Sequence, residues 1–129
     1  MSDTTLSGIV PGPSRQSAPS LQGFANAAIE ADGVYLASLA AITQLEVRTR
    51  NSVYKLTMLG DGRVLVLGGA FFPVWTEAHL SGSTLGGGFL KVGWVGCGFC
   101  MEFLHAGQRI VTTRAKEIRK IEASAASVS

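Results

Sequence analysis

The stretch SGSTLGGGFLKVGWVGCGFCMEF, residues 81–103, joins a glycine loop to the longest apolar, β-prone run in the chain. From residue 89 onward both alternating faces of the run are largely apolar, which predicts strands that are buried on both sides. One straight strand over residues 89–103 would span about 50 Å, whereas a domain of this length has a radius of gyration of roughly 13 Å. We therefore expect the run to bend or split at Gly96–Gly98, as in a small barrel or a tightly coiled sheet.

The composition indicates one domain with a thin polar surface. The chain has 129 residues, of which 47% are hydrophobic and 16% are charged, and its net charge is +2. That length is enough for a single domain with a core. So small a net charge does not by itself indicate nucleic acid, although the segment after His105 is locally basic. Because so apolar a chain leaves apolar surface for a partner, we expect a homo-oligomer.

The sequence pattern predicts neither a targeting segment nor a membrane span. Residues 1–20 lack the basic start and apolar core of a signal peptide, and no charge-free apolar run reaches the length of about 18 residues that a span needs. We therefore expect a cytoplasmic protein with no membrane contact. In that compartment the two cysteines are expected to be thiols rather than a disulfide.

Domain boundaries follow from composition and periodicity. Residues 1–20 are rich in Ser, Pro, Gly and Thr and predict a flexible arm. Ser20 is a suitable N-cap for a helix over residues 21–42, which Asp32-Gly33 could split in two. The functional interpretation is an interaction helix, and the simpler one is that the helix covers one end of the sheet. The helical face is indicated by apolar side chains at spacings of four and three: Phe24, Ala28, Ala31, Tyr35, Leu39 and Ile42. A β-rich domain over residues 21–122, this helix included, and a frayed tail over 123–129 complete the chain.

After the helix we predict six to seven short antiparallel strands. Turns are indicated at Asn51-Ser52 and at Gly60-Asp61-Gly62. The third strand should end at Phe71-Phe72-Pro73, because proline cannot donate a ladder hydrogen bond, and residues 76–80 should form a short fourth strand. Residues 115–123 favour a terminal helical turn. The predicted fold class is therefore mainly β, a small antiparallel barrel or coiled sheet with an N-terminal helix.

Arginines on the predicted strands form the leading candidate for a ligand site. If the first and last strands are neighbours, as barrel closure would make them, four guanidiniums gather there: Arg48, Arg50, Arg109 and Arg114. Such groups bind phosphates bidentately. The adjacent glycine loop, with Gly86, Gly87 and Gly88, could add backbone amides as an anion nest. The simpler interpretations are a solvated polar face for the arginines and a sharp crossover between strands for the loop.

Cys97 and Cys100 form a C-x-x-C pair, which raises a metal or redox hypothesis. One such pair supplies half of a tetrahedral site, and the spacing of His79 and His105 matches no common zinc knuckle. Cysteines three apart on a strand point to opposite faces, and no helix is signalled for redox use. The simpler interpretation is that both are small buried side chains. We predict no metal, no cofactor and no catalytic residues, and hence not an enzyme.

Two short segments carry a family resemblance. Thr49-Arg50-Asn51-Ser52-Val53-Tyr54 fits a T-x-N-S-x-Y opening strand, and Ile110-Val111-Thr112-Thr113 fits a closing I-x-T-[ST]-x-V strand, with Ala115 near the place of the closing valine. Over residues 45–118 the chain resembles a loose set of small bacterial and phage β-domains. That neighbourhood includes the phage sponge proteins that sequester cyclic nucleotide signals, which are oligomers. The resemblance implies a non-enzymatic β-domain and an oligomer, and no binding residue is carried over from it.

Three functions stay open on the sequence. The first is a non-catalytic, self-associating β-domain that acts as a structural or binding module. The second is a binder of phosphate-bearing ligands, such as a nucleotide, a cyclic nucleotide signal or nucleic acid, at the arginine-lined face. The third is a metal or redox protein that uses the C-x-x-C pair.

Overall fold

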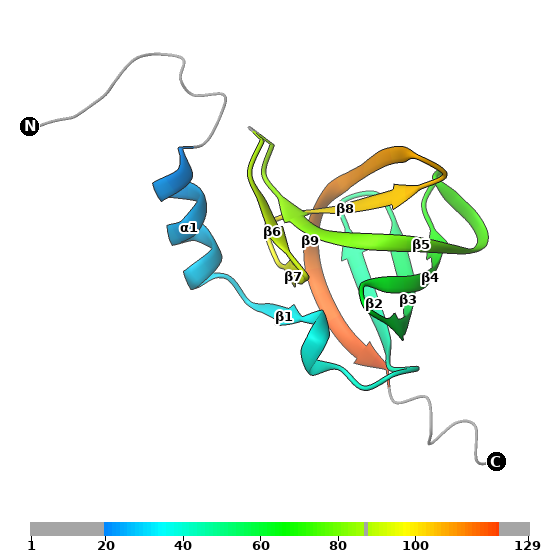
Figure 1. The fold of residues 1–129 in the computed structure, drawn as a ribbon. Coiled ribbons are helices and arrows are strands. Elements are labelled where there is room, and N and C mark those ends of the chain that lie inside the picture. Colours follow the sequence, from blue (N-terminus) through cyan, green and yellow to red (C-terminus); the bar gives the residue numbers. More distant parts are fainter. Residues whose placement is uncertain (1–19, 87, 122–129) are drawn as a thin grey trace, which may run out of the picture.

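Six antiparallel strands pair into a partly closed ring. The computed structural model describes residues 20–86 and 88–121; nearly all of the predicted arm and the whole predicted tail lie outside these ranges. The strand order is β4-β3-β2-β9-β8-β5, and β5 pairs again with β4 (Figure 1). The strands of the ring are β2 (Gln44–Thr49), β3 (Val53–Gly60), β4 (Arg63–Gly68), β5 (Phe72–Thr84), β8 (Cys100–His105) and β9 (Gln108–Ile121). The predicted mainly β, barrel-like fold is confirmed.

The core of the ring comes from the period-two pattern of its strands. In β2, Leu45 and Val47 are buried while Arg48 is exposed, and in β4 Val64 and Val66 point inward. Alternation of this kind places one face of each strand inside the barrel. Phe72 and Phe103 are fully buried and meet edge to face, with ring centroids 5.2 Å apart. An interior filled in this way is a packed core rather than a channel.

The run that begins at residue 81 splits, as predicted, although into more pieces than the two expected. The end of β5 turns into β6 (Leu90–Val92), which is followed by β7 (Trp94–Gly96) and then by β8. The corners lie at Gly93, with φ 69°, and at Gly98, with φ 88°, backbone conformations that favour glycine. Gly96, which we expected at the corner, instead lies inside β7 opposite Gly33 of β1 (Gly33–Tyr35).

The predicted helix over residues 21–42 is correct in its first half and wrong in its second. α1 (Leu21–Glu30) begins at Ser20, whose Oγ accepts a hydrogen bond from the Gly23 amide at 2.9 Å, and it ends before Asp32-Gly33. The chain then forms β1 and a short 3-10 helix, Leu36–Ser38. These segments, rather than α1, pack against the barrel core through Val34, Leu36 and Leu39. Residues 33–35 form a strand rather than a helix because they pair with β7.

Two further expectations for the strands are wrong. The fourth strand is not confined to residues 76–80, because β5 starts at Phe72 and includes Pro73, where the strand is exposed. Residues 115–121 form no helical turn, because this half of β9 pairs with β2 and places Ile118 opposite Val47. The long, bent β5 pairs with β4 along its first half and with β6 and β8 along its second.

Candidate functional site

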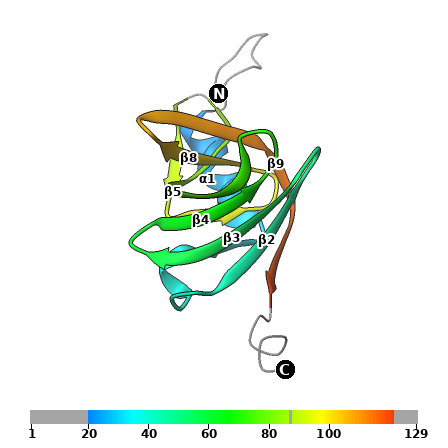
Figure 2. The same ribbon diagram turned by 90° about the vertical axis from the view of Figure 1, so that its right-hand side faces the viewer.

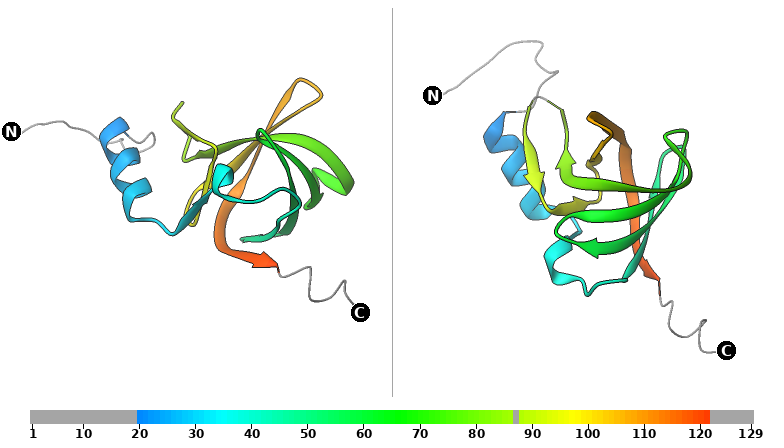
Figure 3. Two further views of the ribbon diagram at one scale, coloured as in Figure 1. Left: turned by 60° about the horizontal axis from the view of Figure 1, so that its bottom comes forward. Right: turned by 45° about the vertical axis from the view of Figure 1, so that its right-hand side comes forward.

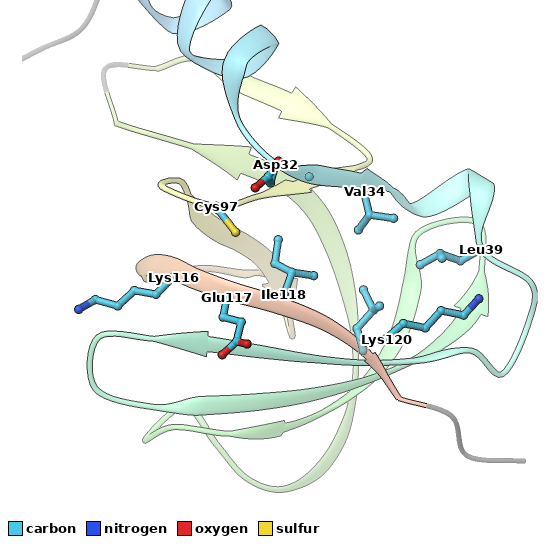
Figure 4. A pocket seen from close by; sticks show the side chains of 10 residues that line it. Asp32, Val34, Leu39, Cys97, Lys116, Glu117, Ile118 and Lys120 are labelled. Carbon is cyan, nitrogen blue, oxygen red and sulfur yellow. The ribbon is translucent and has the colours of Figure 1, made fainter. Parts of the chain in front are cut away.

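A cavity of about 400 Å³ lies between β1 and the second half of β9. Figure 4 shows its apolar floor, which includes Val34, Leu39 and Ile118, and the sulfur of Cys97 facing it. Asp32, Lys116 and Glu117 also line it. The alternation of β9 produces this arrangement, because Ile118 and Lys120 lie opposite the inward-facing Val47 and Leu45. The cavity therefore combines apolar contact with mixed charge.

The two cysteines lie in different surroundings. Burial raises the pKa of the Cys97 thiol, and the Asp32 and Glu117 carboxylates raise it further, against a hydrogen bond with the Ile118 backbone that lowers it. Burial also raises the pKa of Cys100, against the opposing charge of Arg114. Both cysteines are free. Thiols with raised pKa values are poor nucleophiles at neutral pH, so the geometry does not favour thiol chemistry.

A second cavity, of about 550 Å³, lies at the end of the barrel. Its walls come from the β3–β4 turn, the start of the 3-10 helix, and the corner between β6 and β7. Asp61, Arg63 and His79 lie at its polar side, and Met58 and Leu80 are among its apolar lining. Arg63 is engaged in an ion pair with Glu77 at 3.1 Å. The polar groups carry opposite charges, so they do not indicate one class of ligand.

The third hollow is a groove between α1 and β6–β7, with a volume of about 630 Å³, which we call the α1 groove. Its residues are Leu21, Phe24, Ala25, Ala28, Ile29, Ala31, Gly33, Tyr35, Leu90, Lys91 and Trp94. The lining is mainly apolar, and its polar groups include the hydroxyl of Tyr35 and the ammonium of Lys91, which lies 5.1 Å from the centre of the Tyr35 ring and 5.5 Å from that of Trp94. A hollow with this lining is suited to apolar side chains of a partner.

Large exposed apolar side chains occur on two sides of the molecule. One group lines the α1 groove: Leu21, Ile29 and Tyr35. The other, which we call the apolar tip, lies at the start of β3 and around the β4–β5 turn: Val53, Phe71, Val74 and Trp75. Gly68, opposite Phe72, approaches the Val53 backbone closely, which brings the members of the tip together. Single exposed apolar residues are ordinary, whereas groups of them indicate interaction surfaces.

The structure brings only part of the predicted arginine cluster together. β2 and β9 are paired, as barrel closure requires, and Thr49 lies opposite Ala115, so that Arg50 and Arg114 are near neighbours. Arg48 is held by Glu117 at 3.3 Å. Arg109 lies roughly 15 Å further along the extended strand, where it pairs with Glu102 at 3.1 Å. The register therefore places Arg114, but not Arg109, near the end of β2, where Arg48 and Arg50 lie.

The glycine loop connects β5 to β6. Gly86 and Gly88 both have positive φ, and the Gly86 amide donates to Thr84 Oγ1 at 2.9 Å. Thr84 lies opposite Cys100, and Cys100 lies opposite Arg114, so β8 separates the loop from the arginines. Gly87 lies outside the described residues. The loop serves as the crossover that we gave as its simpler interpretation.

In the part of the chain that the structure describes, no three His, Cys, Asp or Glu side chains are placed to hold a metal ion. His79 lies at the barrel-end cavity, whereas His105 packs against Phe72 with ring centroids 6.2 Å apart. No helix among residues 20–86 and 88–121 is long and apolar enough to cross a membrane. No protein-family model, curated protein or solved structure matches the chain.

Sequence reasoning missed the α1 groove and the apolar tip. The predicted helix placed Phe24, Tyr35 and Leu39 on one face, but Tyr35 lies on β1 and is exposed. At the apolar tip, the sequence predicted only that a strand ends at Phe71-Phe72-Pro73. The run Phe71-Phe72-Pro73-Val74-Trp75 could have indicated the tip. Only every second residue of a strand lies on its buried face, so five consecutive apolar residues leave some apolar side chains on the other face.

Proposed function

We propose that the chain is a non-catalytic module that associates with copies of itself through the surface around α1. The observation that carries the proposal is the incomplete burial of this helix. α1 has ten residues, and Phe24 is its one buried side chain. A helix of that length is marginal unless packing supports it. Ile29 is nevertheless 81% exposed.

The contacts of Phe24 show how α1 is attached to the barrel. Its ring lies 5.6 Å from that of Phe99 and 5.8 Å from that of Phe89, and Trp94 meets Phe99 at 5.1 Å. This small aromatic cluster is separate from the core of the barrel. Figure 1 shows α1 beside the barrel rather than across its end. A second copy that covered Leu21 and Ile29 would bury the remaining apolar side of the helix.

The non-catalytic part of the proposal is supported by the state of the thiols. Both cysteines have raised pKa values, which favour the protonated, unreactive form. These surroundings do not favour the alternative hypothesis that the pair has a redox use.

Native mass spectrometry of Leu21→Ser combined with Ile29→Ser tests the proposal. We expect the wild-type chain to form a discrete oligomer and the double variant to be monomeric, because the exposed apolar side of α1 is lost. Leu104→Ser is the matched control, since Leu104 is also exposed but lies on β8, away from the α1 groove. A wild-type chain that is monomeric, or a double variant that assembles like the control, would contradict the proposal.

A second candidate function, binding of phosphate-bearing ligands, is favoured by the pairing of Thr49 with Ala115, which puts Arg50, just after β2, near Arg114 on β9. Lys116 follows on β9 and adds positive charge to the same region. Among the described residues the observed ion pairs engage Arg48, Arg63, Arg109 and Arg119, but neither Arg50 nor Arg114. Two guanidiniums that form no ion pair within the described residues suit the bidentate recognition of a phosphate group.

Binding of short single-stranded nucleic acids and of nucleotides, measured across a salt series, tests this candidate. We expect Arg50→Ala with Arg114→Ala to weaken binding and to reduce its dependence on salt, because phosphate contacts release counterions. Arg63→Ala is the control, since Arg63 lies on β4 and is paired with Glu77. Equal binding by all three proteins would exclude the arginine site.

A further inference from the structure

The α1 groove and the apolar tip lie on opposite sides of the barrel. Figure 3 shows α1 on one side and the start of β5 on the other in both of its views, and Figure 2 looks onto β4 and β5 with α1 behind them. A surface that pairs with itself produces a two-fold dimer, whereas two different surfaces that match each other produce a head-to-tail contact. The position of the two surfaces therefore bears on the kind of assembly.

One surface is a groove and the other presents exposed apolar side chains. The α1 groove has a volume of about 630 Å³. The tip presents three consecutive exposed residues of β5, Pro73, Val74 and Trp75, which follow the buried Phe72. Val74 and Trp75 are 67% and 47% exposed. Aromatic side chains presented in this way are typical anchors of an interface.

The charges around the two surfaces are complementary. Glu30 and Asp32 lie at the end of α1, and both are exposed, as are Arg50 and Lys55 on either side of Val53. The ion pairs within the described part of the chain involve none of these four side chains. Lys91 is the cation at the groove, and it lies over the rings of Tyr35 and Trp94. The groove side therefore has two exposed acidic side chains after α1 beside the one cation of its lining, and the tip has two exposed basic side chains.

We infer that copies of this chain associate head to tail, with the apolar tip of one copy seated in the α1 groove of the next. The inference rests on the proposed self-association and specifies its partner surface. Each copy then offers one groove and one tip, so assembly continues until a ring closes or a filament forms. These charged side chains orient the contact, since Glu30 and Asp32 of one copy face Arg50 and Lys55 of the next.

A mixing experiment with two variants tests the inference by native mass spectrometry. The groove variant carries Leu21→Ser and Ile29→Ser, and the tip variant carries Val74→Ser and Trp75→Ser. We expect each variant alone to be monomeric, because one half of every contact is missing. An equimolar mixture should form a one-to-one heterodimer and nothing larger, because it contains one intact groove and one intact tip. Recovery of the heterodimer also shows that both variants are folded.

The other outcomes separate this inference from the proposal on which it rests. If the tip variant assembles like the wild type while the groove variant is monomeric, the contact is two-fold, so the head-to-tail inference fails and the proposed self-association stands. If the groove variant assembles while the tip variant does not, the head-to-tail inference and the proposed self-association through α1 both fail. A monomeric wild-type chain also contradicts both. Two monomeric variants that form no heterodimer also overturn the inference.

A charge exchange tests the orientation of the contact. Glu30→Lys with Asp32→Lys should weaken association about tenfold, since exposed charge pairs contribute modestly and like charges repel. Adding Arg50→Glu and Lys55→Glu to the same chain should restore the wild-type affinity, because the two pairs of charges then match again with reversed signs. Association that stays weak in the quadruple variant would contradict the proposed orientation.

Discussion

At the scale of single residues, Trp94 sets the contact between β1 and β7. Gly33 and Gly96 lie opposite each other in these strands, and a Cβ added at either position would overlap the indole ring of Trp94. Neither glycine has a positive φ, so its role is to leave space rather than to permit a special backbone conformation. The indole in turn packs against Phe99. A pair of glycines thus allows a large side chain to lie flat across two strands.

We therefore predict that Gly96→Ala lowers the free energy of unfolding by about 1–3 kcal/mol, the usual cost of inserting a methyl group into a packed site. Urea denaturation measures the change. Gly23→Ala is the control, because it adds the same methyl group to α1, where helix propensity improves by about 1 kcal/mol. A Gly96→Ala variant as stable as the wild type would mean that the indole does not occupy this space.

Cys97 gives a second prediction at this scale. Because burial and the carboxylates of Asp32 and Glu117 raise the pKa of its thiol, less thiolate is present at neutral pH, and alkylation by iodoacetamide should be slow. Asp32→Asn removes one of these negative charges, so the pKa should fall and the pH profile of alkylation should shift to lower pH. Cys100, whose pKa does not depend on Asp32, is the internal control. Mass spectrometry of the alkylated peptides measures both sites, and an unchanged profile for Cys97 would contradict the assignment.

At the scale of elements, the strands of the ring could be predicted from the sequence more completely than the segments around it. Alternating burial and the turns at Asn51-Ser52 and Gly60-Asp61-Gly62 identify β2, β3 and β4. Residues 31–42 could not be assigned, because apolar spacing there fits a helix while β1 depends on its pairing with β7. Residues 115–121 were misassigned for the same reason, since their partner β2 lies some 70 positions away. A local pattern contains no information about such a partner.

The attachment of α1 leads to a prediction at this scale. Phe24→Ala should detach the helix, because loss of the aromatic contacts removes about 3–5 kcal/mol from a short helix with no other buried side chain. Hydrogen exchange of a dilute, dissociated sample should show loss of protection in residues 21–30, with the strands of the ring unchanged. Leu21→Ala, at an exposed position of the same helix, is the control. Retained protection in Phe24→Ala would show that other contacts hold α1.

At the scale of the whole molecule, the candidate sites depend on pairings between distant strands. The sequence indicated which arginines lie on strands, but not that Arg48 and Arg109 face carboxylates. It also could not indicate the α1 groove, which is formed by residues from 21–35 and 90–94, two segments that β2–β5 separate in the sequence. Cavities and surfaces of this kind arise from tertiary structure. The composition therefore led us to expect a homo-oligomer but not to locate the surface through which the copies would associate.

The same scale gives a prediction about stability. A partner that binds the folded chain and not the unfolded one raises the melting temperature by mass action. We therefore expect the melting temperature to rise with protein concentration for the wild-type chain, and to be independent of concentration for Leu21→Ser with Ile29→Ser. Differential scanning calorimetry over a concentration series measures both. A melting temperature that is constant for the wild type would contradict association of the folded chain.

The two tryptophans lie in different environments. Trp94 is 3% exposed in the small aromatic cluster, whereas Trp75 stands on the apolar tip and is about half exposed. Their fluorescence should therefore report two different events. Collisional quenchers in the solvent should reach Trp75 but not Trp94. A decrease in the quenching of Trp75 therefore reports that the tip has become covered. A red shift in the emission of Trp94 reports unfolding. The chain thus contains its own optical reporter for each process, without any label.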